Sequence, residues 1–380
     1  MKPVLIENDS QMHELAEQLQ PEKLENNLIA VDTEFFRETT YYPKLALVQI
    51  ATDSIVACID PLAFDARPAL KKILLDEHLR KVFHSCSQDM EVLYYYLGEA
   101  PVNIYDTQLA HALLDEHQQI GYAALVEKEL GVQLDKSQTR TNWLQRPLTQ
   151  KQIDYAGDDV FYLYQLQQTL DRKLDEAGRK AWFEEDSRHV HCNENNFQVD
   201  MDRLWKRVKG SSRLNRKKLA VVQAIARWRE QLAQQKDLTR RKVMADNIVV
   251  DLAFNPPDEL HALQAMLDRR QRLNTQELQT LLDTITQARQ LPAEQWPDNQ
   301  FSILDDRQKG LLKKLQQQLA EKAGELGLST GILCSRKDLE QLILQSERDN
   351  EEALNTLGIC HGWRYECIGR ALVDTIHNAK

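Results

Sequence analysis

Two carboxylates follow directly on a short apolar run, and this feature constrains the fold more than any other. Residues Leu28-Ile-Ala-Val31 have the character of a buried central strand, and Asp32 and Glu34 follow, two positions apart. Alternate residues of a strand point to the same face, so a strand that continues through Glu34 places both carboxylates side by side. Like charges so placed repel each other and lose hydration unless a cation lies between them. If the strand ended at Val31, both would lie in a solvated loop. The strand alone leaves these two interpretations equally open.

A long helix predicted over residues 149–177 supplies a further carboxylate. Its apolar stripe contains Ala156, Val160, Leu163 and Leu166. At helical spacing Asp159 falls on this apolar side, whereas Asp158 falls on the polar side. Periodicity therefore predicts that Asp159 faces inward. Tyr155, one turn earlier, faces the same way, and it is either a partner of Asp159 or an ordinary core tyrosine.

A third acidic position lies where a predicted strand ends and a predicted helix begins. The segment His84-Ser-Cys-Ser-Gln-Asp89 makes this transition, which places Asp89 in the first helical turn. A negative charge there suits the helix dipole, so capping alone explains Asp89. The same holds for Asp106, which begins the next helix.

The arrangement of these elements predicts a mixed α/β sheet followed by helical segments. Strands are predicted over 28–36, 44–52, 55–60, 81–84 and 102–105, and helices over 11–19, 68–75, 87–97, 107–114, 122–130 and 149–177. After about residue 205 strand-like runs nearly vanish, and the two prolines in residues 291–298 interrupt the helical pattern. We therefore expect domains at residues 1–200, 205–292 and 298–380.

Charge is distributed unevenly along the chain. The total of 48 basic and 58 acidic residues argues against a nucleic-acid partner, but residues 201–250 alone contain 14 basic and 4 acidic side chains. Such a block is typical of a phosphate-binding surface, although a solvated helical face gives the same pattern. The cations that we expect to hold nucleic acid are Arg213, Arg216, Lys217, Lys218, Arg240, Arg241 and Lys242.

The sequence also indicates where the protein works. No apolar run approaches the ~18 residues of a membrane helix, and the first residues do not resemble a secretory signal. The six cysteines include no Cys-x-x-Cys pair. We expect a cytoplasmic, monomeric protein without a membrane partner.

Taken together, these motifs resemble those of the DEDDy 3′→5′ exonucleases. Asp32-Thr-Glu34, Asp89 and Tyr155-x-x-x-Asp159 correspond to their three motifs, and the surrounding sequence is most similar to the ribonuclease D family. Residues 219–253, including Ile225-Ala-Arg-Trp-Arg-Glu, resemble a helicase-and-RNase-D C-terminal (HRDC) domain. A weaker likeness at Cys334-Ser-Arg-Lys-Asp-Leu suggests a second one. Cys86 stands where the family usually has Gly or Ala.

The resemblance implies a fold and a metal-dependent reaction. The fold is an α/β ribonuclease H-like exonuclease domain, a mixed sheet flanked by helices, followed by two all-α helical-bundle HRDC-type domains. By the resemblance, Asp32, Glu34, Asp89 and Asp159 hold two divalent ions, Mg²⁺ or Mn²⁺. Asp32 bridges both ions, Glu34 and Asp159 hold the one that carries the attacking water, and Tyr155 orients that water.

Contacts to the substrate are less well defined by the sequence. Phe35 and His84 border the first and second motifs, and Lys136, Arg140 and Trp143 lie between the second and third. These side chains are candidates to meet phosphate or to stack on a base. A surface loop pinned by a core tryptophan explains the last three equally well, and a core role explains Phe35.

The expected function is 3′→5′ exoribonuclease activity that releases 5′-nucleoside monophosphates from structured RNAs, tRNA precursors above all. One alternative keeps the chemistry but acts on DNA, because the carboxylates do not read the 2′-OH. The other is a non-catalytic nucleic-acid-binding protein that works through its HRDC domains. The presence of all the motif carboxylates favours an enzyme.

Overall fold

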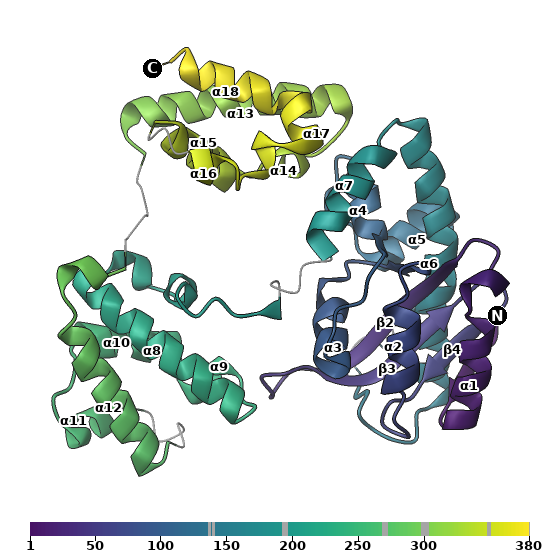
Figure 1. Cartoon of the computed structure of the whole chain (residues 1–380), viewed down its shortest axis with the longest axis horizontal. Coiled ribbons are helices and arrows are strands. Elements are labelled where there is room, and N and C mark those ends of the chain that lie inside the picture. The colour runs from purple at the N-terminus through teal and green to yellow at the C-terminus, as the bar shows by residue number, and fades with distance from the viewer. Residues whose placement is uncertain are drawn as a thin grey trace. The chain divides into compact units, whose positions relative to one another are not determined.

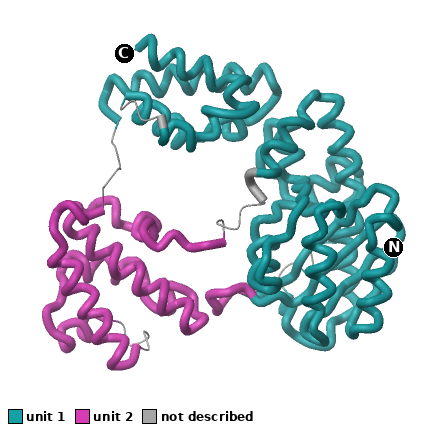
Figure 2. The backbone as a smooth tube through the Cα atoms, viewed as in Figure 1, with its two compact units in different colours: residues 1–36, 44–194, 304–380 teal, residues 37–43, 195–303 magenta. Residues whose placement is uncertain are grey.

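The computed structural model describes residues 1–135, 138, 141–191, 197–267, 273–297, 304–347 and 351–379, with the backbone alone for residues 189–191 and 351. The chain divides into two compact units, coloured teal and magenta in Figure 2. Unit 1 consists of Met1–Phe36, Lys44–Glu194 and Leu304–Lys380, and unit 2 of Arg37–Pro43 and Asn195–Ile303. This division differs from the three segments expected from the sequence, because the C-terminal helices share a core with the N-terminal domain.

Unit 1 contains a six-stranded mixed sheet with the order β1-β4-β3-β2-β5-β6. The strands are β1 (Val4–Ile6), β2 (Leu28–Phe36), β3 (Lys44–Ala51), β4 (Val56–Ile59), β5 (Arg80–Phe83) and β6 (Ile104–Asp106). β3 runs antiparallel to β2 and β4, whereas β2, β5 and β6 run parallel to one another. The carboxyl ends of these parallel strands meet at one edge of the sheet, where ligands bind in open α/β folds.

Helices cover this sheet. They are α1 (Asp9–Gln18), α2 (Arg67–Leu74), α3 (Ser87–Leu97), α4 (Thr107–Ala112), α5 (Tyr122–Leu130), α6 (Gln150–Glu176) and α7 (Lys180–His191), with a short turn of helix η1 (Pro21–Lys23). α6 packs across β2, β3 and β4, and α3 packs on β2 and β3 (Figure 1). Every residue of β3 after Lys44 is buried, as a strand with both faces covered requires.

The predicted elements of this region are confirmed to within two residues at each end. Three elements have no counterpart in the prediction, β1, η1 and α7. β1 has only three residues and exists through its parallel pairing with β4, a contact that local sequence does not encode. Among the described helices of the whole chain, none combines the length and apolar character needed to cross a membrane.

The C-terminal helices belong to unit 1. They are α13 (Asp306–Leu326), α14 (Thr330–Leu333), α15 (Arg336–Glu347), α16 (Glu351–Leu354), η6 (Gly358–Cys360), α17 (Gly362–Arg364), η7 (Tyr365–Gly369) and α18 (Arg370–His377). Trp363 stacks on Trp182 of α7, with ring centroids 4.3 Å apart. Arg364 forms an ion pair with the Asp186 carboxylate at 2.5 Å, and both side chains are largely buried. These contacts attach α17 to α7.

Unit 2 is a helical bundle. Its elements are η3 (Leu204–Arg207), η4 (Ser211–Arg213), α8 (Arg216–Gln235), α9 (Arg240–Val243), α10 (Asp246–Phe254), α11 (Leu260–Met266), α12 (Thr275–Arg289) and η5 (Ala293–Gln295). α8 is the central helix, and α10, α12 and η3 pack on it. Residues 37–43 also belong to this unit, since the Tyr41 and Tyr42 amides both donate to the Asp237 carboxylate at 3.0 Å.

The segments α8–α10 and α13–α15 repeat the same local structure 90 positions apart. In each, a residue with positive φ follows the end of a long helix by one or two positions, Asp237 (φ 48°) or Gly327 (φ 62°). The next residue, Leu238 or Leu328, donates its amide to an alanine carbonyl five positions earlier at 2.9 Å. A four-residue helix follows, α9 or α14. The second helical segment is therefore built like the first over this stretch.

Candidate functional site

The two carboxylates of β2 lie side by side on a continuous strand. β2 runs through both of them to Phe36, which rules out a strand that ends at Val31. In the antiparallel pairing with β3, Asp32 lies opposite Gln49 and Glu34 opposite Leu47, and a bulge follows directly after Glu34. Residues 28–31 are buried, whereas Asp32 and Glu34 are half-buried. Both acids are thus partly accessible, although the first half of their strand is buried in the core.

α6 brings Asp159 and Tyr155 to the same place. A capping box fixes the start of this helix, in which Thr149 and Gln152 satisfy each other's backbone amides. Asp159 is half-buried and Asp158 is exposed, as the periodicity predicts. The Tyr155 hydroxyl donates a hydrogen bond to the Asp159 carboxylate, so the two side chains act as a pair one helical turn apart.

Asp89 joins this group from the first turn of α3. Its side chain is 8% exposed, and its carboxylate accepts a hydrogen bond from the Thr33 hydroxyl. The preceding loop is held by the Asp106 carboxylate, which accepts the Ser85 amide at 2.9 Å and the Cys86 amide at 3.0 Å. Asp106 therefore fixes the backbone of Ser85 and Cys86, which directly precedes the helical turn that carries Asp89. Cys86 is fully buried in this loop with an ordinary helical φ of −66°.

Burial, with neighbouring charges, raises the pKa values of all four carboxylates. Burial, together with the Asp159 charge, raises the pKa of Asp32 to about 8. Burial and the charges of Asp32, Asp159 and Asp89 raise the pKa of Glu34 to about 10. Burial raises the pKa of Asp159 to about 7, although the hydrogen bond from Tyr155 acts in the opposite direction. Burial and the charge of Asp32 raise the pKa of Asp89. Asp32, Glu34 and Asp89 thus lie in one another's electric field, together with Asp159.

This cluster fits divalent cations by its chemistry. Among the described residues, no basic side chain contributes to the pKa shifts of the four carboxylates, so their repulsion is uncompensated within the chain. An all-oxygen, highly charged donor set suits Mg²⁺ and Mn²⁺. In the described part of the chain no three acidic, His or Cys side chains are already arranged around a common ion position. Metal binding therefore requires side chains of the cluster to move closer around a shared ion position.

The candidate substrate contacts have different surroundings. Phe35 is half-buried next to Glu34 at the bulge. His84 is half-buried, with its ring nitrogens 2.9 Å from the Thr107 hydroxyl and 3.1 Å from the Ile120 carbonyl, and burial lowers its pKa. Lys136 and Arg140 lie outside the described residues.

The surroundings of Trp143 favour a core role over base stacking. The side chain is 5% exposed and packs with Ala46, Leu47 and Ile153. Stacking on a base requires an exposed ring face, which this residue does not have. Its ring centroid lies 6.2 Å from that of Tyr155, so Trp143 instead supports the side chain beside Asp159.

Tyr122 is a neighbour of the site that the sequence did not single out. Its hydroxyl donates to the Asp158 carbonyl oxygen at 3.1 Å, and its ring centroid lies 5.6 Å from that of His84. Burial and the charges of Asp159 and Asp32 raise its pKa, which places it within the field of the carboxylates. Tyr122 begins α5 after Gly121, a position without any motif, so only the tertiary structure identifies it.

The seven predicted basic contacts divide between the two ends of α8, a helix of 20 residues and so about 30 Å long. At its start Arg216 donates to the Trp296 and Pro297 carbonyls, and Lys218 lies 3.4 Å from the centre of the Phe254 ring. Beyond its end Arg240 is paired with the buried Glu230. The exposed members without an ion pair to a described residue include Arg213, Lys217 and Arg241.

Comparisons with known proteins agree with these features. A family model described as 3'-5' exonuclease matches residues 3–175, and the HRDC domain model matches residues 218–285. The chain is 34% identical to a ribonuclease D of Sphingobium indicum over 358 residues, which covers 92% of this chain and 89% of that protein. It is also 34% identical to a ribonuclease D of Pseudomonas paraeruginosa, with 92% of each chain covered.

Among solved structures, the fold is similar to that of Escherichia coli RNase D, described as an exoribonuclease involved in structured RNA processing. The TM-score is 0.85 at 29% sequence identity, over 100% of this chain and 99% of that one. The likeness thus extends through the exonuclease domain, the HRDC domain and the C-terminal helices.

Proposed function

Since this chain belongs to the ribonuclease D family of hydrolytic 3′→5′ exoribonucleases, we propose that it trims the 3′ ends of structured RNAs, tRNA precursors above all. The observation that carries this proposal is the cluster of Asp32, Glu34, Asp89 and Asp159 at the carboxyl edge of the sheet. The exonuclease fold implies the use of divalent metal ions. We propose that the protein acts as a monomer in the cytoplasm, where tRNA precursors are available.

The four carboxylates are the proposed ligands of two divalent ions, Mg²⁺ or Mn²⁺. When bound, such ions supply charge stabilisation to the phosphodiester that is cleaved. The uncompensated repulsion within the cluster supports this assignment, because cations would relieve it. Hydrolysis consumes one water, breaks the bond between phosphorus and the 3′ oxygen, and yields a 5′-nucleoside monophosphate and an RNA with a new 3′-hydroxyl.

Tyr155 is the proposed positioning group for the attacking water. Its hydroxyl donates to Asp159, and its ring packs beside Trp143, so its place is fixed from both sides. The hydroxyl carries its proton in this hydrogen bond, which favours orientation of the water over removal of a proton from it.

A pair of neighbouring aspartates provides the test. The Asp159→Asn variant keeps the size of the side chain but removes its charge from the cluster. We expect it to abolish Mg²⁺-dependent release of mononucleotides from a tRNA precursor labelled at its 3′ end. The matched control is Asp158→Asn, which makes the same change on the exposed side of the same turn. Equal activity of Asp159→Asn and wild type would refute the site.

A further inference from the structure

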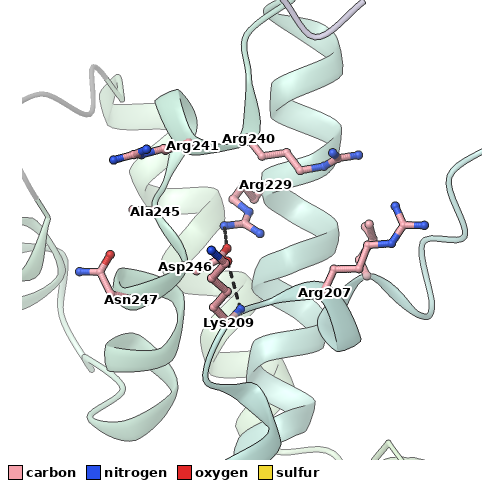
Figure 3. A pocket seen from close by; sticks show the side chains of 9 residues that line it. Arg207, Lys209, Arg229, Arg240, Arg241, Ala245, Asp246 and Asn247 are labelled. Carbon is pink, nitrogen blue, oxygen red and sulfur yellow. Dashed lines mark hydrogen bonds and ion pairs between the residues drawn. The ribbon is translucent and has the colours of Figure 1, made fainter. Parts of the chain in front are cut away.

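Unit 2 contains a pocket that is lined mainly by basic side chains (Figure 3). Its volume is about 640 Å³, within the range of small-molecule sites. The lining residues are Leu204, Arg207, Lys209, Arg229, Arg240, Arg241, Ala245, Asp246 and Asn247. Five of these side chains are cationic and one is acidic, so the pocket favours an anion. Of the seven basic residues predicted as nucleic-acid contacts, only Arg240 and Arg241 line it.

Arg229 forms the centre of the pocket and is the main evidence for a ligand. This residue of α8 is 6% exposed, and its guanidinium donates to the Met244 carbonyl at 2.9 Å and to the Asp246 carboxylate at 2.8 Å. Its Nε is buried and has no hydrogen-bond partner among the described residues. A buried donor of a charged group that lacks a partner costs free energy, and a shift of the guanidinium toward an anion in the pocket would give this donor an acceptor.

The one acidic residue of the pocket is already engaged. The Asp246 carboxylate accepts the Lys209 amide at 3.0 Å as well as Arg229, and Figure 3 shows both interactions at the centre of the pocket. Asp246 also begins α10, where no side chain caps the helix end. A helix start without a cap favours a negative charge. The carboxylate therefore holds Arg229 in place without neutralising the other cations.

Three cations of the pocket remain available to a ligand. Arg240 is paired with the buried Glu230, so its charge is largely satisfied. Arg207, Lys209 and Arg241 are exposed, and no ion pair joins their side chains to a described acidic residue. In Figure 3 Arg207 and Arg241 extend to opposite sides of Arg229. Such a spread suits an extended polyanion that crosses the pocket better than a single compact ion.

The repeat in the chain offers an internal comparison. Positions 90 residues later in the second helical segment share the backbone of α8–α10, yet they replace Arg229, Arg240 and Arg241 by Leu319, Thr330 and Gly331. The helical fold therefore does not require these three arginines. Arg240 compensates the buried Glu230, whereas the presence of Arg229 and Arg241 in the first segment alone points to a ligand.

We propose that this pocket binds a backbone phosphate of the RNA substrate, with one phosphate at the Arg229 guanidinium and the neighbouring phosphates at Arg207, Lys209 and Arg241. The identity of the polyanion as RNA rests on the proposed function, whereas the phosphate chemistry rests on the pocket alone. The site holds the body of the RNA and does not read its sequence, because every contact is to phosphate.

Binding of a short single-stranded RNA, measured by fluorescence anisotropy in EDTA at several salt concentrations, tests the proposal. The double variant Arg207→Gln/Lys209→Gln removes two exposed charges, so it should keep the fold and the melting temperature. We expect its affinity to fall about tenfold and the slope of log K against log salt to decrease by about 1.4, since each charge contributes about 0.7 on a single strand. The Ala245→Phe variant, which fills the pocket without a change in charge, should also weaken binding.

The matched control is Lys313→Gln/Lys314→Gln, which removes two exposed charges from α13 and should leave affinity unchanged. Inorganic phosphate and 5′-AMP serve as competitors, and we expect displacement of RNA only at concentrations far above that of the RNA. The proposal would be contradicted if the pocket variants bound RNA as tightly as wild type does. It would also be contradicted if 5′-AMP displaced the labelled RNA as effectively as unlabelled RNA does. A wild-type protein that neither binds nor cleaves RNA would instead contradict the proposed function.

Discussion

The hydroxyl of Thr33 donates a hydrogen bond to the carboxylate of Asp89, a residue 56 positions away in the sequence. Thr33 lies between Asp32 and Glu34 on β2. This contact ties the first turn of α3 to the strand that holds the other two acids. It makes Thr33 a positioning residue for Asp89.

Loss of this hydrogen bond should lower activity without unfolding the protein. The Thr33→Val variant keeps the shape of a buried side chain that is 6% exposed but removes the donor. A hydrogen bond to a charged group contributes about 1.5–3 kcal/mol, so we expect kcat/KM for mononucleotide release to fall roughly 10- to 100-fold. Thr33→Ser retains the hydroxyl and should recover most of the activity. A Val variant as active as wild type would show that the contact is dispensable.

Removal of the Tyr155 hydroxyl tests its role beside Asp159. In Tyr155→Phe the ring still packs on Trp143, so the thermal stability should change little. We expect kcat to fall about 10²-fold or more, as is typical when a group that handles a proton or water is lost. If Tyr155 orients water rather than removing its proton, the residual activity should keep the pH dependence of wild type. A changed pH profile in Tyr155→Phe would indicate a general base instead.

The raised carboxyl pKa values predict how metal binding depends on pH. Asp32, Glu34 and Asp159 have pKa values of about 8, 10 and 7 in the folded, metal-free protein. Ordinary carboxyls titrate near pH 4, so between about pH 4 and 8 the folded state binds more protons than the unfolded chain. The free energy of unfolding should therefore fall as pH rises through this range.

A divalent cation competes with these protons, so its stabilising effect should grow with pH. We expect a larger increase in melting temperature on addition of Mg²⁺ at about pH 8.5 than at about pH 6. The double variant Asp32→Asn/Asp159→Asn should lose most of this difference, because it lacks two of the titrating groups. A Mg²⁺ effect that is the same at both pH values in wild type would contradict the electrostatic description of the cluster.

The Asp186–Arg364 ion pair should contribute strongly to the stability of unit 1. Arg364→Leu leaves the buried Asp186 carboxylate without its cation, and breaking a buried pair from one side costs roughly 3–5 kcal/mol. We expect a clear loss of free energy of unfolding in denaturant titrations. The double variant Asp186→Leu/Arg364→Leu should be less destabilised than Arg364→Leu alone. Additive losses would show that the two side chains are not coupled.

Much of the catalytic region could be predicted from the sequence, because its signals are local. Strand alternation placed Asp32 and Glu34 on one face, and helical periodicity distinguished Asp159 from Asp158. Both patterns depend on residues a few positions apart. The ends of α3, α5 and α6 follow from equally local features, such as the capping box at Thr149 and the glycines after α3 and α5.

The remaining features depend on contacts between distant segments. The sequence could not predict that α17 packs on α7 through Trp182 and Trp363, so the C-terminal helices looked like a separate domain. The sequence also could not show which basic side chains are paired with an acidic residue and which are available to a ligand. Arg240 looked like a nucleic-acid contact but is paired with the buried Glu230, whereas Arg229, deep in α8, lines the basic pocket.

The most direct test of the central claim is digestion of matched RNA and DNA oligonucleotides labelled at their 5′ ends, with Mg²⁺ or with EDTA. We predict that the RNA shortens stepwise from its 3′ end and releases 5′-nucleoside monophosphates, that EDTA stops the reaction, and that Asp32→Asn is inactive. Internal cleavage, activity in EDTA, or hydrolysis of DNA alone would contradict the claim that the carboxylate cluster is the centre of a 3′→5′ exoribonuclease.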